Sequence, residues 1–241
     1  MPRGKRPASV DSSAVVLFIA FAGLVSAIGF CRSYYSSEAR ARRALQGLRR
    51  TAMRDARDGE RCRVVGRLEY TDSTLEAPFT ARECAGYSVR VKNDDSGGGE
   101  VLREDRCRDF FLRDENGTCA LIRGTSAQIQ IVLTKDASFR SLAPLTLIWP
   151  KLEEPPPRVE AFMKERGHSI KGRFFSKTIR FDEGVLEKGE LVSVSGVARW
   201  EATPDPHASG GAYREMPKLL TLSSAPGEPL VISDEPDTTS G

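Results

Sequence analysis

Residue types that perform catalysis are scattered along this chain and are not grouped. The two histidines, His168 in "ERGHSI" and His207 in "PDPHASGG", have no nucleophile or acid at a motif spacing beside them. Each is better explained as a capping or solvated histidine than as a general base. The five cysteines form no Cys-x-x-Cys pair, which leaves a zinc site without sequence support. The sequence therefore predicts no catalytic, cofactor-binding or metal-binding residue, and no cofactor.

The acidic residues favour turns over acid–base chemistry. Asp94 and Asp95 precede three glycines, but they lack the alternating acids of a calcium loop and the Gly-Lys-Ser/Thr ending of a phosphate loop. Nothing pairs Glu60, Glu183 and Glu190 as acid and base, so we expect them in turns or as buried hydrogen-bond acceptors. The competing hypothesis is an envelope hydrolase whose pocket converges on Glu183 or His168.

Cysteine and charge content leave the compartment open. Four cysteines, Cys62, Cys84, Cys107 and Cys119, would allow two disulfides of unknown connectivity in an oxidising compartment. We favour scattered free thiols of a cytosolic domain. The net charge is +3, and the basic excess is concentrated between residues 32 and 57. This distribution indicates a membrane neighbourhood and no nucleic-acid partner.

A stretch near the N-terminus has the length of a membrane span. Ala14–Cys31, "AVVLFIAFAGLVSAIGFC", contains eighteen residues without charge or proline. That length just crosses a hydrocarbon layer about 30 Å thick, so we expect one transmembrane helix after a short tail, residues 1–13. The alternative is a cleaved secretory signal ending near Val25-Ser26-Ala27. The apolar run continues past Ala27, which favours an uncleaved anchor.

The residues flanking this span predict its orientation. More arginines follow the span than there are basic residues before it, so we expect the rest of the chain on the cytoplasmic side of a single-pass membrane protein. Within the span, Gly23, Ala27 and Cys31 lie four residues apart and share one helix face. Small residues on such a face would let two helices approach as a homodimer.

The basic segment after the span has helical periodicity. Within residues 32–57 we expect a juxtamembrane helix from Ser36 to Arg57, with Ser37 as the N-cap. The apolar positions fall on one stripe, which comprises Ala41, Leu45, Leu48, Ala52 and Ala56. The helix would lie on anionic headgroups, stand as a stalk, or serve only as a solvated connector.

From Asp58 onward the hydrophobic period changes to two, which is typical of strands. Many short strands with Gly-rich turns predict a mainly β (α+β) fold of antiparallel barrel or sandwich type. The expected strands begin with Cys62–Gly66 and continue with Tyr87–Lys92, Asp109–Arg113, Thr118–Ile122, Ala127–Leu133, Leu145–Trp149 and Ser169–Phe181. The predicted core comprises Val64, Leu68, Val89, Phe111, Leu121, Ile129, Ile131, Leu147, Phe162, Val192, Val194 and Val197.

One segment of the β-rich region occurs twice. "GERCRVVGRLEY", Gly59–Tyr70, aligns without a gap with "GELVSVSGVARW", Gly189–Trp200. We interpret the copies as equivalent strands of two related halves, about residues 58–150 and 168–234, although such a pattern also recurs by chance in β-barrels. A short helix from about Arg158 to Arg166 follows a proline run and separates the halves. Residues 235–241 are expected to be a disordered tail.

The order of several segments resembles a known family. The most specific are "FLRDENGTCALI", "FDEGVLEKGELVSVSGVA" and "PLVISD", within Ser36–Asp234. In this order they resemble the GIDE, or beside-a-membrane (BAM), domain of the MULAN/GIDE E3 ubiquitin ligase family and its bacterial relatives. The ligases add a second span and a zinc-binding RING, whereas this sequence has no cysteine after Cys119. The resemblance implies the membrane-apposed protein-contact module alone, at residues 58–234, without ubiquitin-ligase activity.

Three functions remain in competition at this point. We favour a noncatalytic, membrane-anchored interaction, sensor or scaffold module, whose partners are the lipid bilayer and another protein. A lipid-binding or small-ligand-binding β-barrel is the second hypothesis, and a hydrolase with a site built from scattered residues is the third. A deep pocket would favour the third hypothesis, and a barrel cavity the second.

Overall fold

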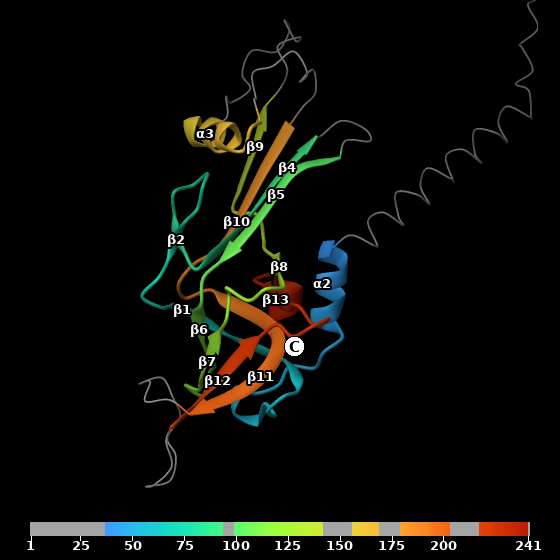
Figure 1. Ribbon diagram of the computed structural model, residues 1–241, viewed down its shortest axis with the longest axis vertical. Helices are drawn as coiled ribbons and strands as arrows, with labels where there is room; N and C mark the ends of the chain where they lie inside the picture. The colour runs from blue at the N-terminus through green and yellow to red at the C-terminus, as the bar shows by residue number, and fades with distance from the viewer. Residues whose placement is uncertain (1–36, 94–98, 142–155, 169–178, 203–216, 241) are drawn as a thin grey trace, which may run out of the picture. The chain divides into compact units, whose positions relative to one another are not determined.

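A computed structural model describes residues 37–93, 99–141, 156–168, 179–202 and 217–240 (Figure 1). Several predicted features lie outside the described residues: the tail 1–13, the span 14–31, the strand Leu145–Trp149, most of the strand Ser169–Phe181, and His207. Within the described ranges, no helix is both long and apolar enough to cross a bilayer. The chain divides into two compact units after Arg40, and the architecture below is that of the second unit.

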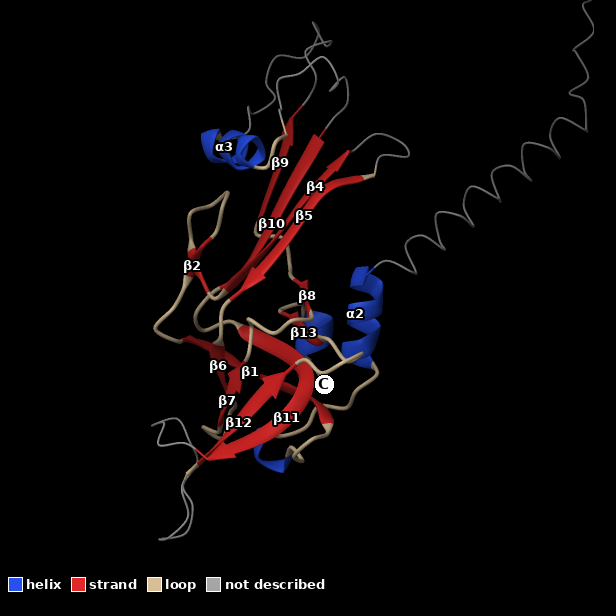
Figure 2. Ribbon diagram, in the orientation of Figure 1, coloured by secondary structure: helices blue, strands red, loops and turns tan. Residues whose placement is uncertain are grey.

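The second unit is mainly β, as the sequence predicts, and strands dominate it (Figure 2). Five strands form a closed barrel, in the order β1 (Arg61–Tyr70), β6 (Phe110–Arg113), β7 (Cys119–Ile122), β12 (Lys218–Ser223) and β11 (Leu191–Ala202). β11 pairs with β1 and closes the ring. The β7–β12 pair is parallel and the other pairs in the ring are antiparallel. Two further strands extend the sheet from β11: β13 (Leu230–Ser233) and then β8 (Ile129–Val132).

Side chains fill the interior of this barrel. Val64 and Leu68 on β1 lie in one buried cluster with Val192 and Val194 on β11, and all four are fully buried. These four predicted core residues are therefore confirmed. Five more members of the predicted core are also buried: Val89, Phe111, Ile131, Phe162 and Val197. Leu121 and Ile129 are only partly buried, and Leu147 lies outside the described residues.

A second, four-stranded antiparallel sheet stands beside the barrel. Its order is β5 (Glu100–Cys107), β4 (Gly86–Asn93), β10 (Ile179–Leu186) and β9 (Ala137–Ser141). Helix α3 (Pro157–Glu165) and the pair β2–β3 (Leu75–Glu76 and Glu83–Cys84) cover one face. There the Phe79 ring makes edge-to-face contacts with Phe139, Phe162 and Phe181 at centroid distances of 6.3, 5.2 and 6.3 Å. The helix predicted near Arg158–Arg166 is thus present, and its apolar side packs on this sheet.

The prediction of two related halves is wrong. Strand β10, from the second stretch of the sequence, lies between β4 and β9 from the first. The two copies of the repeat do not occupy equivalent places in separate halves, because β1 and β11 pair with each other in one barrel. Two strands with the same sequence pattern can pair with each other in one sheet. Sequence similarity alone does not distinguish that arrangement from two stacked sheets.

The helix predicted from Ser36 to Arg57 is shorter in the structure. Helix α2 spans Ser37–Gln46, and the chain then turns at Gly47, whose amide donates to the carbonyl of Arg43 at 2.8 Å. A short 3-10 helix, η1 (Met53–Asp55), follows. Ala41, Leu45 and Ala56 are buried. The apolar pattern is therefore real, but it reflects packing on the β region along a path that is helical only in part.

The C-terminal residues are also ordered differently from the prediction. Pro236–Thr239 form a short helix, α4, in which Thr238 and Thr239 are buried. Thr238 hydrogen-bonds Ser233 at 3.0 Å between their hydroxyl oxygens. The prediction of a disordered tail at 235–241 is therefore wrong up to residue 240, because this segment packs on β13, the strand that precedes it.

Candidate functional site

Glu183 is a buried structural acceptor. Its side chain is fully buried on β10 and accepts three hydrogen bonds, from the Phe79 amide at 2.6 Å, the Thr80 amide at 3.0 Å and the Thr80 hydroxyl at 2.6 Å. The carboxylate thereby fixes the loop between β2 and β3. This arrangement agrees with the predicted role as a buried acceptor. It gives the carboxylate no open space in which to meet a substrate, which weakens the hydrolase hypothesis at this residue.

The other predicted acids and the described histidine also lie in turns. Glu190 accepts a hydrogen bond from the Glu187 amide at 2.8 Å, and Glu60 is exposed, with its carbonyl bonded to the Ala198 amide. The backbone amide of His168 bonds the Met163 carbonyl at 2.9 Å at the end of α3. The structure does not bring His168 and Glu183 together around either of the open pockets described below.

The four described cysteines are free thiols. Burial raises the pKa of the Cys62 thiol to about 11 and that of the Cys84 thiol to about 12. The pKa of Cys107 is also raised, again chiefly by burial. Since the thiolate is the nucleophile, these three side chains are poor nucleophiles at neutral pH.

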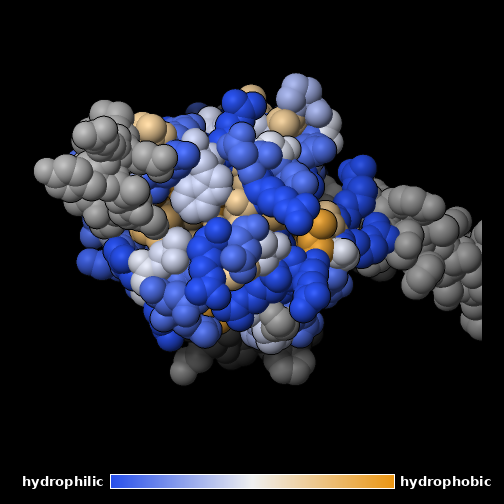
Figure 3. All heavy atoms as spheres, turned by 90° about the horizontal axis from the view of Figure 1, so that it is seen from below, coloured by the Kyte–Doolittle hydropathy of each residue, from blue (hydrophilic) through white to orange (hydrophobic). Residues whose placement is uncertain are grey.

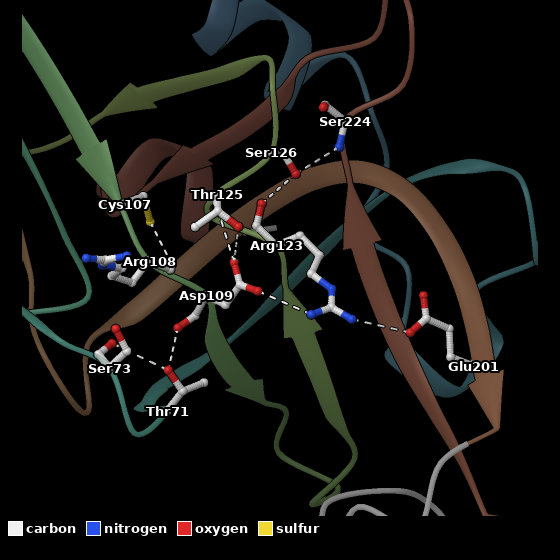
Figure 4. A network of polar contacts seen from close by, with 10 residues as sticks. All are labelled: Thr71, Ser73, Cys107, Arg108, Asp109, Arg123, Thr125, Ser126, Glu201 and Ser224. Atoms are coloured by element: carbon white, nitrogen blue, oxygen red, sulfur yellow. Dashed lines mark hydrogen bonds and ion pairs between the residues drawn. The ribbon is translucent and has the colours of Figure 1, made fainter.

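A polar network fixes the rim of the barrel beside Cys107 (Figure 4). Asp109 accepts hydrogen bonds from the Thr125 amide at 3.1 Å and the Thr125 hydroxyl at 2.8 Å, and its second oxygen meets Arg123 at 3.3 Å. Arg123 also pairs with Glu201 at 3.4 Å. An open pocket of about 340 Å³ adjoins this network. Because both carboxylate oxygens of Asp109 hold the segment after β7, and its carbonyl accepts from the Thr71 hydroxyl at 2.8 Å, we interpret the network as structural.

A second open pocket, of about 400 Å³, lies where the chain leaves α2. It is lined by Arg49, Arg50, Met53 and Asn116 among others. Arg50 pairs with the exposed Glu115 at 3.4 Å, so part of its charge is already balanced. Both pockets lie outside the barrel, whose interior is packed. A ligand cavity inside the barrel, the second sequence hypothesis, therefore has no support in the described residues.

The face of the four-stranded sheet opposite α3 is rich in cations, although Ser88 and Asp182 on it are buried, and we call it the basic face. In an antiparallel sheet, directly opposed residues project from the same side. The register therefore places five cations on this face: Arg90 and Lys92 of β4, Arg103 of β5, Arg140 of β9 and Arg180 of β10. Ser88, Arg90 and Lys92 alternate along β4 and so share one side of it, but their neighbours on other strands depend on pairing that the sequence does not display.

Two acids of the basic face are already engaged. Asp182 accepts a hydrogen bond from Ser138 at 2.7 Å and pairs with Lys135 at 2.7 Å. Asp105 accepts from the Ser88 hydroxyl at 2.6 Å and is bonded by the Arg103 guanidinium at 2.6 and 2.8 Å. These contacts order the lower part of the face.

Burial and neighbouring positive charge lower the pKa values of two cations on the basic face. Burial lowers the pKa of Arg90, and Arg103 lowers it further. Burial also lowers the pKa of Lys92, followed by repulsion from Arg90, while Glu100 opposes the shift. Asp105, Glu100 and Asp182 oppose the shift of the Arg90 pKa.

The described surface offers little apolar area for docking. Among the described residues, Leu191 is the one large hydrophobic side chain that is exposed, at 41 %. The face in Figure 3 is correspondingly dominated by hydrophilic residues. Charge, more than hydrophobic area, therefore distinguishes one surface of this unit from another.

Comparison of the chain with family models, with curated proteins and with solved structures found no match.

Proposed function

We propose that this protein is a noncatalytic, single-pass membrane-anchored interaction, sensor or scaffold module, similar to the GIDE domain and without ubiquitin-ligase activity. In this proposal residues 14–31 form the anchor and the β-rich unit lies on the cytoplasmic side. Its partners are the bilayer and a second protein. Gly23, Ala27 and Cys31 supply a face through which two spans associate.

The packing of α2 on the β region is the observation that carries this proposal. Ala41 and Leu45 are buried in a cluster with Val132 of β8 and Val231 of β13. Arg42 forms an ion pair with Glu235, beside the same strands. A helix held by these contacts is a fixed part of the β unit, not a free stalk.

Only residues 32–36 lie between the proposed span and the first residue of α2. An extended chain covers at most about 3.5 Å per residue, so this connector reaches no farther than roughly 20 Å. The β unit would thus be confined beside the bilayer. Confinement of this kind raises its effective concentration toward any partner in the same membrane, which suits an interaction module.

Membrane retention of the full chain tests the anchor. Membranes containing the protein are washed with alkaline carbonate, and the protein should remain in the pellet. Leu24→Arg places a charge in the middle of the proposed span and should release the protein, whereas the matched variant Leu24→Ile should not. Release of the unmodified chain would contradict the anchor, and turnover of a substrate by the purified chain would contradict the noncatalytic assignment.

A further inference from the structure

The open pocket beside the end of α2 has oppositely charged residues from two segments of the chain. Arg49 and Arg50 line it from the segment that follows α2, and Glu115 lines it from the turn between β6 and β7. The apolar part of the lining comprises Ala52, Met53 and Val65. A pocket of about 400 Å³ that combines apolar side chains with a few polar groups has the size and composition of a small-molecule site.

The Arg49 guanidinium is available to a ligand. The residue is exposed, and within the described ranges its side chain makes no hydrogen bond or ion pair. Thr51 lines the same pocket, and its hydroxyl is likewise unbonded in the part of the chain that the structure describes. The lining thus offers a cation and a neutral donor that no described residue uses.

An exchangeable ion pair joins the two segments that line the pocket. Nη2 of Arg50 lies 3.4 Å from Oε1 of Glu115, and the two side chains are 35 % and 84 % exposed. Exposed pairs at such distances contribute little to stability, because water competes for both charges. A ligand carboxylate therefore has only a weak competitor at Arg50.

The charge beside the pocket favours an anion. Arg63 lies two residues before Val65 on β1, so both side chains leave the same side of that strand. In the described ranges its guanidinium bonds only neutral oxygens, which belong to Ser193, Leu45, Leu48 and Thr238. Burial lowers the pKa of Arg63, and the nearby charge of Arg50 lowers it further.

The acids of the lining do not cancel this charge. They are Glu115 and Asp114, and Asp114 already accepts hydrogen bonds from the Asn116 and Thr118 amides, each at 2.9 Å. Arg49, Arg50 and Arg63 therefore outnumber two acids, one of which is held by the backbone of its own turn.

We propose that this pocket binds a small organic carboxylate with a short apolar body. A guanidinium fork contacts both oxygens of a carboxylate at once, and Arg49 and Arg50 supply two such forks. The apolar side chains of the lining remove the hydrocarbon part of the ligand from water. An inorganic anion would leave that part of the lining uncovered, which favours an organic ligand.

Free carboxylic acids and the C-terminal residues of proteins share this chemistry, and two arms of one experiment separate these sources. The full chain is held in phosphatidylcholine nanodiscs. N-acetyl-leucine represents a C-terminal residue, hexanoate represents a free acid, and N-acetyl-leucinamide is the matched control without the charge. The rate at which phenylglyoxal modifies Arg49 is followed by mass spectrometry during titration with each compound. We expect modification to be at least about threefold slower with a carboxylate bound, and unchanged with the amide.

Substitutions with opposite expected signs locate the site. Arg50→Gln should raise the ligand concentration that half-protects Arg49 at least about fivefold, because one guanidinium fork is lost. Glu115→Gln should lower that concentration at least about threefold, because the competing carboxylate is removed. Arg54→Gln removes a charge from the same segment at a residue that does not line the pocket, and should change it less than about twofold. All three residues are exposed, so these variants should fold like the parent.

Protection by both carboxylates supports a general site for apolar carboxylates. Protection by N-acetyl-leucine alone supports a protein C-terminus as the ligand, and protection by hexanoate alone supports a free acid. Equal protection by N-acetyl-leucinamide, no protection by either carboxylate, or a Glu115→Gln variant that binds no more tightly than the parent overturns the proposal. The proposed function leaves this pocket unassigned, so failure here would leave the carbonate test of the anchor unaffected.

Discussion

Val64 lies directly opposite Val194 in the ladder that closes the barrel. These are also equivalent positions in the two copies of the repeat, as the alignment of Gly59–Tyr70 with Gly189–Trp200 requires. The copies are therefore related by a local two-fold axis through this pair. Both valines are fully buried in the barrel cluster.

The hydrogen bonds around this pair repeat the symmetry. The Gly59 amide donates to the Ala198 carbonyl at 2.8 Å, and the Gly189 amide donates to the Leu68 carbonyl at 2.8 Å. Both glycines have positive φ, at 78° and 88°, which a side chain would disfavour. Each glycine thus bonds the equivalent residue of the other copy's strand, so the two copies pair symmetrically with each other.

A charge at the symmetry centre should unfold the barrel. Val194→Asp leaves an unpaired carboxylate among fully buried side chains, and we expect a loss of more than about 4 kcal/mol in the free energy of unfolding. Leu191→Asp, on the same strand at an exposed position, is the matched control and should cost less than about 1 kcal/mol. Chemical denaturation measures both. Equal melting of Val194→Asp and the parent chain would show that this strand register is wrong.

Gly66 and Gly196 are equivalent glycines within the paired strands of the two copies, and each lies so close to a neighbour that an added methyl group would clash. A Cβ at Gly66 would lie 2.7 Å from the Arg113 carbonyl oxygen, and one at Gly196 would lie 2.7 Å from a terminal methyl of Leu230. We expect Gly66→Ala to cost about 1–3 kcal/mol in unfolding free energy, because a paired backbone cannot move aside. Gly196→Ala should also destabilise the fold, because its Cβ would lie 3.0 Å from the Ser223 carbonyl oxygen and Leu230 is fully buried.

Gly99→Ala is the control for these substitutions, because nothing lies within 4 Å of its Cβ position. Thermal melting of all three variants ranks the effects. A Gly66→Ala variant as stable as Gly99→Ala would contradict the close packing of β1 against β6.

The local parts of the fold could be predicted from the sequence, and the long-range pairings could not. Alternating hydrophobicity identified β4, β6 and β7, and "DENG" identified the turn between β6 and β7, where Gly117 has a φ of 81°. β5 was missed, since "EVLREDRC" is rich in charge, as exposed edge strands often are. The barrel closure joins residues about 130 positions apart, and no local pattern encodes that contact.

The grouping of cations on the basic face could not be predicted from the sequence, for the same reason. Arg140, Arg180 and Lys92 come from three separate segments, and only the pairing of β9, β10 and β4 places them in one row. The buried role of Glu183 could be predicted as a class, an acceptor, but its partners Phe79 and Thr80 come from a loop without periodicity.

The contacts of the Arg63 side chain indicate that the C-terminal segment stabilises the fold. Its side chain is 6 % exposed and donates to the carbonyls of Leu45 at 3.4 Å, Leu48 at 3.2 Å and Thr238. Deletion of residues 235–241 removes the Thr238 carbonyl from a buried guanidinium and should lower the unfolding free energy by about 1–3 kcal/mol.

Deletion of residues 240–241 alone keeps the Thr238 contact and is the control. Denaturant titration of the two truncated chains measures the difference. A disordered tail, as the sequence had suggested, would leave both truncated chains as stable as the parent, and that result would refute the packing of α4.

Glu190 makes the stability of the fold depend on pH in a direction that can be tested. Burial raises the pKa of its carboxyl group to about 7, and Asp234 and Asp136 contribute further in the same direction. In the unfolded chain a glutamate titrates near its ordinary pKa of about 4.3. Between these values the folded state retains a proton that the unfolded chain has released. The contribution of Glu190 to stability is therefore full below about pH 4.3 and is lost as the pH rises through about 7.

Glu190→Gln should remove this dependence. The amide oxygen can still accept the hydrogen bond that the Glu187 amide makes to this side chain at 2.8 Å, but the side chain no longer ionises. We expect the variant and the parent to be equally stable at pH 4, and the variant to be the more stable at pH 8. Glu190→Asp keeps a titratable group and should still lose stability as the pH rises. Denaturant titrations between pH 4 and 8 measure the three profiles, and a constant difference between Glu190→Gln and the parent across that range would contradict the raised pKa.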